Sequence, residues 1–157
     1  MLASDRIFSG YFKDNFNFVD EFEYQKLSRN MLIGDYLKDE NLLGIYRIKV
    51  FRNNGVNYFD LDIKGTIELN RKGIVIETNL PTLTRFTGTY DFELNTNIEF
   101  IKKGMIAGRI DFKDNSIFSL NIDKEKKIGT LTSLKAEVNE EGVSLNKRET
   151  TTFIIED

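Results

Sequence analysis

Apolar and polar side chains alternate through residues 44–70, which read GIYRIKVFRNNGVNYFDLDIKGTIELN. Alternation with a period of two is typical of β-strands that bury one face. Asn53-Asn54-Gly55 interrupts it, and Asn-Gly supplies the positive φ angles that a tight hairpin turn needs. We therefore expect a strand over 45–52, a hairpin turn, and a long second strand over 56–70 that bends at Gly65.

The same rhythm of short alternating runs and turn residues continues to the C-terminus, and no helix pattern separates the runs. This spacing is typical of antiparallel barrels and sandwiches. The sequence therefore predicts an all-β (mainly β) fold, an antiparallel up-and-down meander of about ten strands that forms a barrel or a closed sandwich. Beyond residue 70, strands are expected over 73–79, 84–94, 98–101, 105–112, 117–122, 128–138, 143–149 and 151–155.

The chain before residue 43 has a different character, because aromatic residues are dense there. Phe8, Phe12 and Phe16 are four apart, which predicts a helix up to about residue 19, although a period of two competes with it. A second short helix is expected over 28–40, with Ser28 as N-cap and Gly34 as its weak point. We expect one domain, 1–157, in which 1–43 is a partly helical extension and 44–157 is the β-domain. The aromatic residues of the extension, which pack on the barrel or on a partner, are Phe8, Tyr11, Phe12, Phe16, Phe18, Phe22 and Tyr24.

The composition excludes several classes of chemistry. The chain has 157 residues with 40% hydrophobic and 30% charged side chains, but it contains no His, Cys or Trp. Histidine and cysteine are the usual general bases, nucleophiles and metal ligands, so triads, thiolate chemistry and zinc sites are absent in their usual forms. No other catalytic motif is present. We therefore rank an enzyme third, after a binding module and a structural or interaction protein, and we expect no cofactor and no metal site.

Net charge and hydropathy limit the partners and the location. The formal net charge is −3 and the sequence pI is about 5.2, so nucleic acid is not an expected partner. No apolar run is long enough for a membrane span. Asp5 and Arg6 lie where a secretion signal would need its apolar core, which predicts a cytoplasmic protein.

The interior of a closed barrel is the first candidate site. Ten strands could enclose a small apolar or amphipathic ligand, because the diameter of a barrel grows with its strand number. Gly88 and Gly108 fall on the inward faces and would leave space there. The alternative is that the inward side chains simply fill a core. The predicted ligand-binding residues are Tyr46, Phe59, Phe86, Tyr90, Phe92, Ile110 and Phe118.

Gly44-Ile45-Tyr46 opens the first strand after a helical stretch. In this it resembles the lipocalin and fatty-acid-binding barrels (the calycins), whose first strand opens with Gly-x-Trp and leads into an up-and-down meander. Tyr46 stands where those barrels have tryptophan, and Arg148 is the residue that could match their late-strand arginine. The resemblance implies a calycin-like barrel that binds a ligand.

Lysine-rich turns are the second candidate site. Successive turns of a meander alternate between its ends, so Lys102 and Lys103 should share an end with Lys124, Lys126 and Lys127. Arg52 joins them if 56–70 is one strand. Such a basic patch could bind an anionic surface, or its lysines could simply be solvated. Asp60, Asp62 and Asp91 are expected on a solvated strand face, paired with cations. The leading hypothesis is thus a non-enzymatic binding module; the alternative is a structural or interaction protein that self-associates or docks a partner through its aromatic N-terminus, its sheet edges or these lysines.

Overall fold

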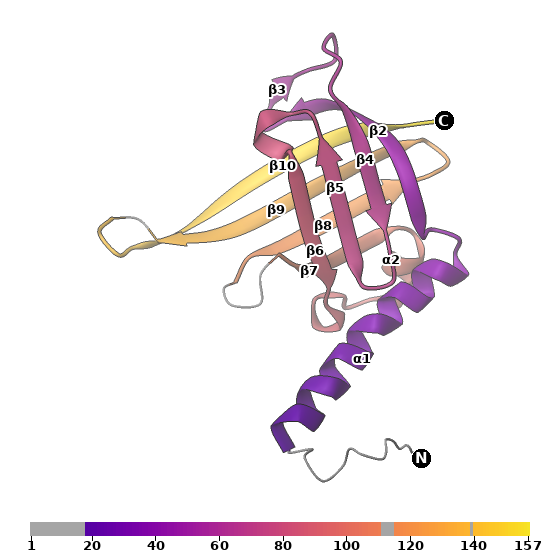
Figure 1. Ribbon diagram of the computed structural model, residues 1–157, viewed down its shortest axis with the longest axis vertical. Coiled ribbons are helices and arrows are strands. Elements are labelled where there is room, and N and C mark those ends of the chain that lie inside the picture. The colour runs from indigo at the N-terminus through magenta and orange to yellow at the C-terminus, as the bar shows by residue number, and fades with distance from the viewer. Residues whose placement is uncertain (1–17, 111–114, 139) are drawn as a thin grey trace.

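The computed structural model describes residues 18–110, 115–138 and 140–157. It begins with helix α1 and continues into an antiparallel β-structure that two short 3₁₀-helices and one short helix interrupt (Figure 1). The elements are α1 (Phe18–Asp39), β2 (Gly44–Asn53), β3 (Val56–Asn57), β4 (Lys64–Leu69), β5 (Gly73–Thr78), η1 (Pro81–Leu83), β6 (Arg85–Tyr90), η2 (Phe92–Leu94), α2 (Ile98–Lys102), β7 (Met105–Arg109), β8 (Ile117–Asp123), β9 (Ile128–Val138) and β10 (Ser144–Glu156).

The strands form a closed barrel rather than a sandwich. Each strand from β4 onward pairs antiparallel with its neighbour along the chain, and β10 then pairs with β2, from Thr151 opposite Asn53 to Glu156 opposite Arg47. Strands β2 and β4 to β10 make the barrel, while β3 pairs with the end of β2 outside it. The predicted antiparallel up-and-down barrel is confirmed.

One side of each strand fills the interior with branched and aromatic side chains. This core continues into the buried faces of α1 and α2, which lie across one end of the barrel, here called the helical end (Figure 1). The opposite end carries the connections that follow β2, β5 and β7. The most buried large side chains are Ile33, Leu37, Ile48, Ile67, Leu69, Ile74, Ile76, Tyr90, Ile101, Ile106, Phe118 and Phe153.

Helix α1 corrects the prediction of two short helices. It is continuous from Phe18 to Asp39, so Ser28 is an exposed residue within it and not an N-cap. Gly34 is not a weak point but a contact: a Cβ there would lie 2.1 Å from the Arg71 carbonyl oxygen, so only glycine lets the helix approach the β4–β5 turn this closely. The first predicted helix falls mainly on residues 1–17, outside the described part of the chain.

The end of α1 is set by a Schellman motif. Asn41 has a φ of 58°, the N–H of Leu42 donates to the Leu37 carbonyl (2.8 Å), and the N–H of Asn41 donates to the Lys38 carbonyl (3.0 Å). This pattern satisfies the last carbonyls of the helix and turns the chain sharply into β2. It places the α1–β2 connection at the helical end.

Two predicted strands are wrong. Residues 98–101 belong to α2, because Asn97 caps the helix by accepting a hydrogen bond from the N–H of Glu99 (2.9 Å). The run 56–70 is not one bent strand: β3 ends at Asn57, and residues 58–63 form a connection before β4. Phe59 and Leu61 lie on this connection and are each 54% exposed, although alternation had predicted that they point inward.

A third predicted strand, 84–94, ends early, at Tyr90. Asp91 turns the chain there, because its side chain accepts a hydrogen bond from the N–H of Glu93 (2.9 Å) and caps η2. The carboxylate is completely buried and is paired with Arg109 on β7, so Asp91 does not lie on a solvated face as predicted. Asp60 and Asp62 are exposed, but on the β3–β4 connection and not on a strand.

Candidate functional site: a groove at the helical end

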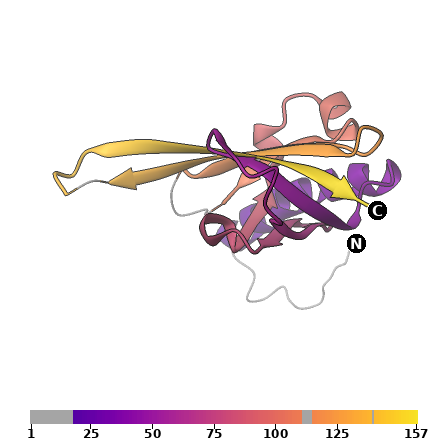
Figure 2. The ribbon, with the colours of Figure 1, turned by 90° about the horizontal axis from the view of Figure 1, so that it is seen from above.

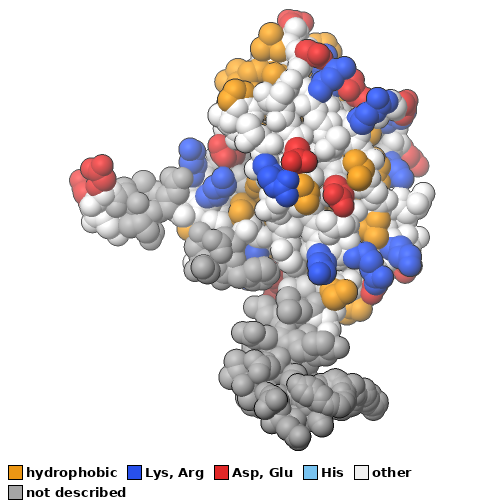
Figure 3. Space-filling model, in the orientation of Figure 1, with side chains coloured by type: hydrophobic (Ala, Val, Ile, Leu, Met, Phe, Trp, Pro, Cys, Tyr) orange, Lys and Arg blue, Asp and Glu red, His pale blue; other side chains and the backbone are white. Residues whose placement is uncertain are grey.

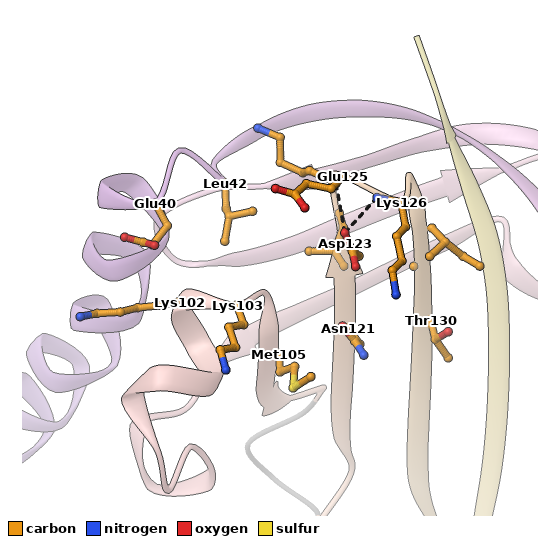
Figure 4. A pocket seen from close by; sticks show the side chains of 14 residues that line it. Glu40, Leu42, Lys102, Lys103, Met105, Asn121, Asp123, Glu125, Lys126 and Thr130 are labelled. Atoms are coloured by element: carbon orange, nitrogen blue, oxygen red, sulfur yellow. Dashed lines mark hydrogen bonds between the residues drawn. The ribbon is translucent and has the colours of Figure 1, made fainter.

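A groove open to solvent lies at the helical end, where α2 and the end of α1 face the β8–β9 turn (Figure 4). Its volume is about 730 Å³. Its walls combine apolar side chains with charged ones of both signs. The lining residues are Glu40, Leu42, Lys102, Lys103, Met105, Asn121, Ile122, Asp123, Lys124, Glu125, Lys126, Ile128, Gly129 and Thr130.

The sheet topology brings the lysines of this groove together. Strand β7 begins just after Lys102 and Lys103, and its antiparallel partner β8 ends just before the lysine-rich turn, with Met105 opposite Asn121. The prediction that these lysines share one end of the β-structure is confirmed. Arg52 lies at the other end, because residues 95–104 form a single helical connection and do not add the strand that would have changed the count of turns.

Short helix α2 fixes the position of Lys102 and Lys103. Its Ile101 is fully buried in the core, so the two lysines that follow are held at the surface. Gly104 has a φ of 87° and turns the chain into β7. The Lys102 ammonium lies 3.9 Å from a Glu99 carboxylate oxygen, whereas the Lys103 ammonium has no partner among the described residues.

The β8–β9 turn fixes the other side of the groove. Asp123 Oδ1 accepts hydrogen bonds from the N–H groups of Glu125 and Lys126, both at 3.0 Å, so this carboxylate holds the turn. The Lys126 ammonium has no partner among the described residues. Lys103 and Lys126 lie on either side of Met105 and Asn121 in Figure 4.

The remaining two predicted lysines hold the structure together. Lys124 donates to the Asn41 carbonyl oxygen (2.8 Å), and its ammonium lies 5.7 Å from the centre of the Tyr46 ring. Lys127 pairs with the Asp157 carboxylate at the end of the chain, and this hydrogen bond and charge lower the pKa of Asp157. Lys103 and Lys126 are therefore the lysines of the groove that remain for an external anion.

The groove also has an apolar part. Met105 is 42% exposed and Ile128 is 38% exposed, while Leu42 and Ile122 of the lining are buried. Glu40 and Glu125 lie near Leu42, and Asp123, which holds the β8–β9 turn, lies between the two lysines (Figure 4). The groove thus has an apolar strip between Lys103 and Lys126 and carboxylates beside it, and an apolar strip with a cation at each side suits an amphipathic molecule with a negative charge.

The predicted interior residues have different surroundings. Phe86, Tyr90 and Phe118 are buried in the barrel, and the rings of Phe86 and Phe118 meet edge to face with their centres 6.0 Å apart. Tyr46, Phe92 and Ile110 are half-buried at its margins. Phe59 is outside the barrel and contacts Phe51 and Lys49 on β2.

The space predicted at Gly88 and Gly108 is occupied by a protein side chain. A Cβ at either glycine would lie 2.4 Å from a ring atom of Phe118. The absence of a side chain at the two glycines therefore makes room for the Phe118 ring. A ligand at this place would have to displace Phe118, which is 1% exposed.

Sequence reasoning missed a polar network beside the helical end. Asn30 on α1 accepts a hydrogen bond from the N–H of Phe92 (2.8 Å), and Asn95 makes hydrogen bonds to both backbone groups of Ala107 (3.0 Å each). These contacts, with the Asp91–Arg109 pair, fasten α1 and η2 to β7. No sequence signal marks them, because each joins residues far apart in the chain.

Two buried polar groups stand out near this network. Tyr90 Oη and Asn30 Nδ2 have no hydrogen-bond partner among the described residues. Burial, and then the negative charge of Glu68, raise the pKa of Tyr90. Burial also raises the pKa of Tyr46, whose hydroxyl donates to the Leu42 carbonyl (2.6 Å). Both hydroxyls stay neutral at physiological pH, and the Tyr46 hydroxyl links β2 to the α1–β2 connection.

The geometry defines a small antiparallel β-barrel with a helical cap and an amphipathic groove. No protein-family model, no curated protein and no solved structure matches the chain. Among the residues the structure describes, no three acidic side chains come together as a metal site would require. No helix in the same residues is long and apolar enough to cross a membrane.

Proposed function

We propose that this protein is a non-enzymatic binding module that holds a small amphipathic anion in the groove at the helical end. The carboxylate, sulfate or phosphate group of the ligand lies between Lys103 and Lys126, and its apolar part covers Met105 and Ile128. The observation that carries this proposal is a pair of ammonium groups on either side of an apolar strip, neither of which has a partner in the described part of the chain.

The groove is favoured over the barrel interior as the place of the ligand. An interior ligand would compete with Phe118 for the space beside Gly88 and Gly108, whereas the groove is already open. The closed barrel remains the scaffold, as the resemblance of Gly44-Ile45-Tyr46 to calycins implies. Its role is to hold α2 and the β8–β9 turn at a fixed separation.

The charge pattern predicts how binding depends on salt. The two lysines are at the surface, so their attraction to an anion is screened as the ionic strength rises. Ion pairs at an exposed surface contribute about 0.2–1 kcal/mol each, so loss of both lysines should weaken binding by about 2- to 30-fold.

A matched pair of fluorescent probes tests the proposal. 1-Anilinonaphthalene-8-sulfonate carries a sulfonate on an apolar frame, and N-phenyl-1-naphthylamine has nearly the same frame without the charge. We expect the native protein to bind the sulfonate more tightly, and Lys103→Gln/Lys126→Gln to remove that preference. Lys64→Gln/Lys72→Gln, which alters the same number of charges outside the groove, should leave binding unchanged.

Two results would contradict the proposal. Equal binding of the sulfonate by the native protein and by Lys103→Gln/Lys126→Gln would show that the lysines hold no ligand. Tight binding of the neutral probe, insensitive to salt and to these lysines, would favour a ligand inside the barrel. Circular dichroism and thermal melts of each variant control for partly unfolded protein, which also binds such probes.

A further inference from the structure

Strands β9 and β10 continue beyond the barrel as a two-stranded arm. The last residue of β9 that pairs with β8 is Leu134, and the first residue of β10 that pairs with β2 is Thr151. Between them, residues 135–138 pair only with residues 144–147, and Arg148 and Glu149 pair with Leu134 and Ser133 where the ribbon joins the barrel. Figures 1 and 2 show this arm projecting from the side of the barrel. We call residues 135–149 the β9–β10 arm.

The arm has an unused strand edge on β10. At its base, the N–H of Asn54 donates to the Thr150 carbonyl (2.8 Å), and the N–H of Thr150 donates to Asn54 Oδ1 (2.9 Å). The peptide groups of Thr150 thus face away from β9. Because this direction alternates along a strand, those of Asn146 and Arg148 also face outward, where no described strand pairs with them.

An isolated two-stranded ribbon is only marginally stable in water, and open strand edges invite pairing. On the β9 side of the arm the N–H of Ala136 donates to Ser116 Oγ (3.2 Å), whereas no described strand pairs with the β10 side beyond β2. These features indicate that the arm is completed by another strand. The charges along the arm indicate which strand that is.

The arm has two acidic residues at its tip, two basic residues further along β10, and Glu137 and Glu149 as additional acidic residues nearer the barrel. Glu140 and Glu141 are exposed at the tip, while Lys147 and Arg148 are exposed along β10 and Lys135 lies opposite Lys147 on β9 (Figure 3). If two arms lie side by side and antiparallel, the acidic tip of each comes beside the basic part of the other. This arrangement needs a two-fold axis near residue 144, because an axis at Lys147 would place Lys147 opposite Lys147 of the other copy.

We propose that the β10 edge of the arm pairs antiparallel with the same edge of a second copy of this chain, forming a dimer with two-fold symmetry. A two-fold axis brings the same surface of both copies together, which an edge with this charge polarity can satisfy. The contact is short, so the dimer forms weakly, at micromolar to roughly millimolar concentration. This inference is independent of the ligand proposed for the groove.

Charge reversal followed by mixing tests the arrangement. Glu140→Lys/Glu141→Lys gives the tip the same charge as Lys147 and Arg148, and Lys147→Glu/Arg148→Glu gives β10 of the arm the same charge as the tip. Sedimentation velocity over a range of concentrations should find each variant monomeric and the native protein in monomer–dimer equilibrium. An equimolar mixture of the two variants should recover the dimer, because both tip-to-base contacts are again between opposite charges.

A backbone variant tests the strand edge itself. Asn146→Pro removes an outward N–H without removing a hydrogen bond to β9, so it should abolish the dimer, whereas Asn146→Ala should retain it. The proposal is overturned if the native chain remains monomeric up to about millimolar concentration, if the mixed variants fail to associate, or if Asn146→Pro dimerises like the native chain. Far-ultraviolet circular dichroism confirms that each variant is folded.

Discussion

Gly88→Ala and Phe118→Ala are each expected to destabilise the barrel. In the Phe118→Ala protein, however, Gly88→Ala should cause no further loss of stability. A Cβ at Gly88 would lie 2.4 and 2.6 Å from two ring atoms of Phe118, and its nearest neighbours all belong to that ring. Overpacking of this kind costs about 1–3 kcal/mol. Phe118→Ala removes a buried ring and should cost about 3–5 kcal/mol. The double variant should be no less stable than Phe118→Ala, which makes the coupling free energy about 1–3 kcal/mol.

Gly108→Ala provides the control for this cycle. Its Cβ would meet the Phe118 ring, but it would also lie 2.2 Å from the carbonyl oxygen of Thr89, which is backbone and cannot move aside. Gly108→Ala should therefore remain destabilising when Phe118 is replaced by alanine. The two glycines face the same ring, and only one of them should be rescued.

Urea unfolding followed by circular dichroism and by tyrosine fluorescence gives the required free energies, provided the two transitions coincide. If Gly88→Ala costs as much in the Phe118→Ala protein as in the native protein, the ring does not occupy the space beside Gly88. If Gly88→Ala alone has no effect, that space is open. Either result would make the barrel interior a candidate ligand site again.

The remaining predictions concern the helical end. Gly34→Ala should destabilise the protein by about 1–3 kcal/mol in urea unfolding, because its Cβ would meet the Arg71 carbonyl. This loss should occur although alanine has the better helix propensity. Equal stability of Gly34→Ala and of the exposed control Ser28→Ala would contradict the close contact. Tyr90→Phe should leave stability unchanged or raise it by about 1 kcal/mol, since the hydroxyl has no partner among the described residues; a clear loss would reveal one. Because the pKa of Tyr90 is raised in the folded state, its contribution should be complete below about pH 10 and decline as the pH rises further; native protein and Tyr90→Phe with the same alkaline profile would refute this.

Local chemistry in the sequence predicted the strands and most turns. Alternation identified the barrel strands because each has one face in the core, and Asn54-Gly55 predicted a hairpin in which both residues indeed have positive φ, 51° and 82°. The shared end of the two lysine-rich turns also followed from the order of the strands. It required only a single turn between the strands predicted over 105–112 and 117–122.

The same rule failed where the run was short or bordered a turn. Residues 98–101 and the segment around Phe59 alternate as strands do, but Asn97 caps a helix in the first case and no strand pairs with the second. Alternation shows which side chains are apolar, but it does not show which elements of the fold pack against them. Pairing with a neighbouring strand decides the outcome, and that is a property of distant residues.

By itself, the sequence determined that this chain is an antiparallel β-structure and that its chemistry excludes histidine and cysteine. Periodicity, turn residues and composition are local properties, and each acts within a few residues. Only the tertiary structure decided that β10 closes the barrel on β2, that the Phe118 ring fills the space at Gly88, and that Lys124 and Lys127 are engaged while the ammonium groups of Lys103 and Lys126 have no partner within the described ranges. These features depend on contacts between residues far apart in the chain, which alternation along one strand does not encode.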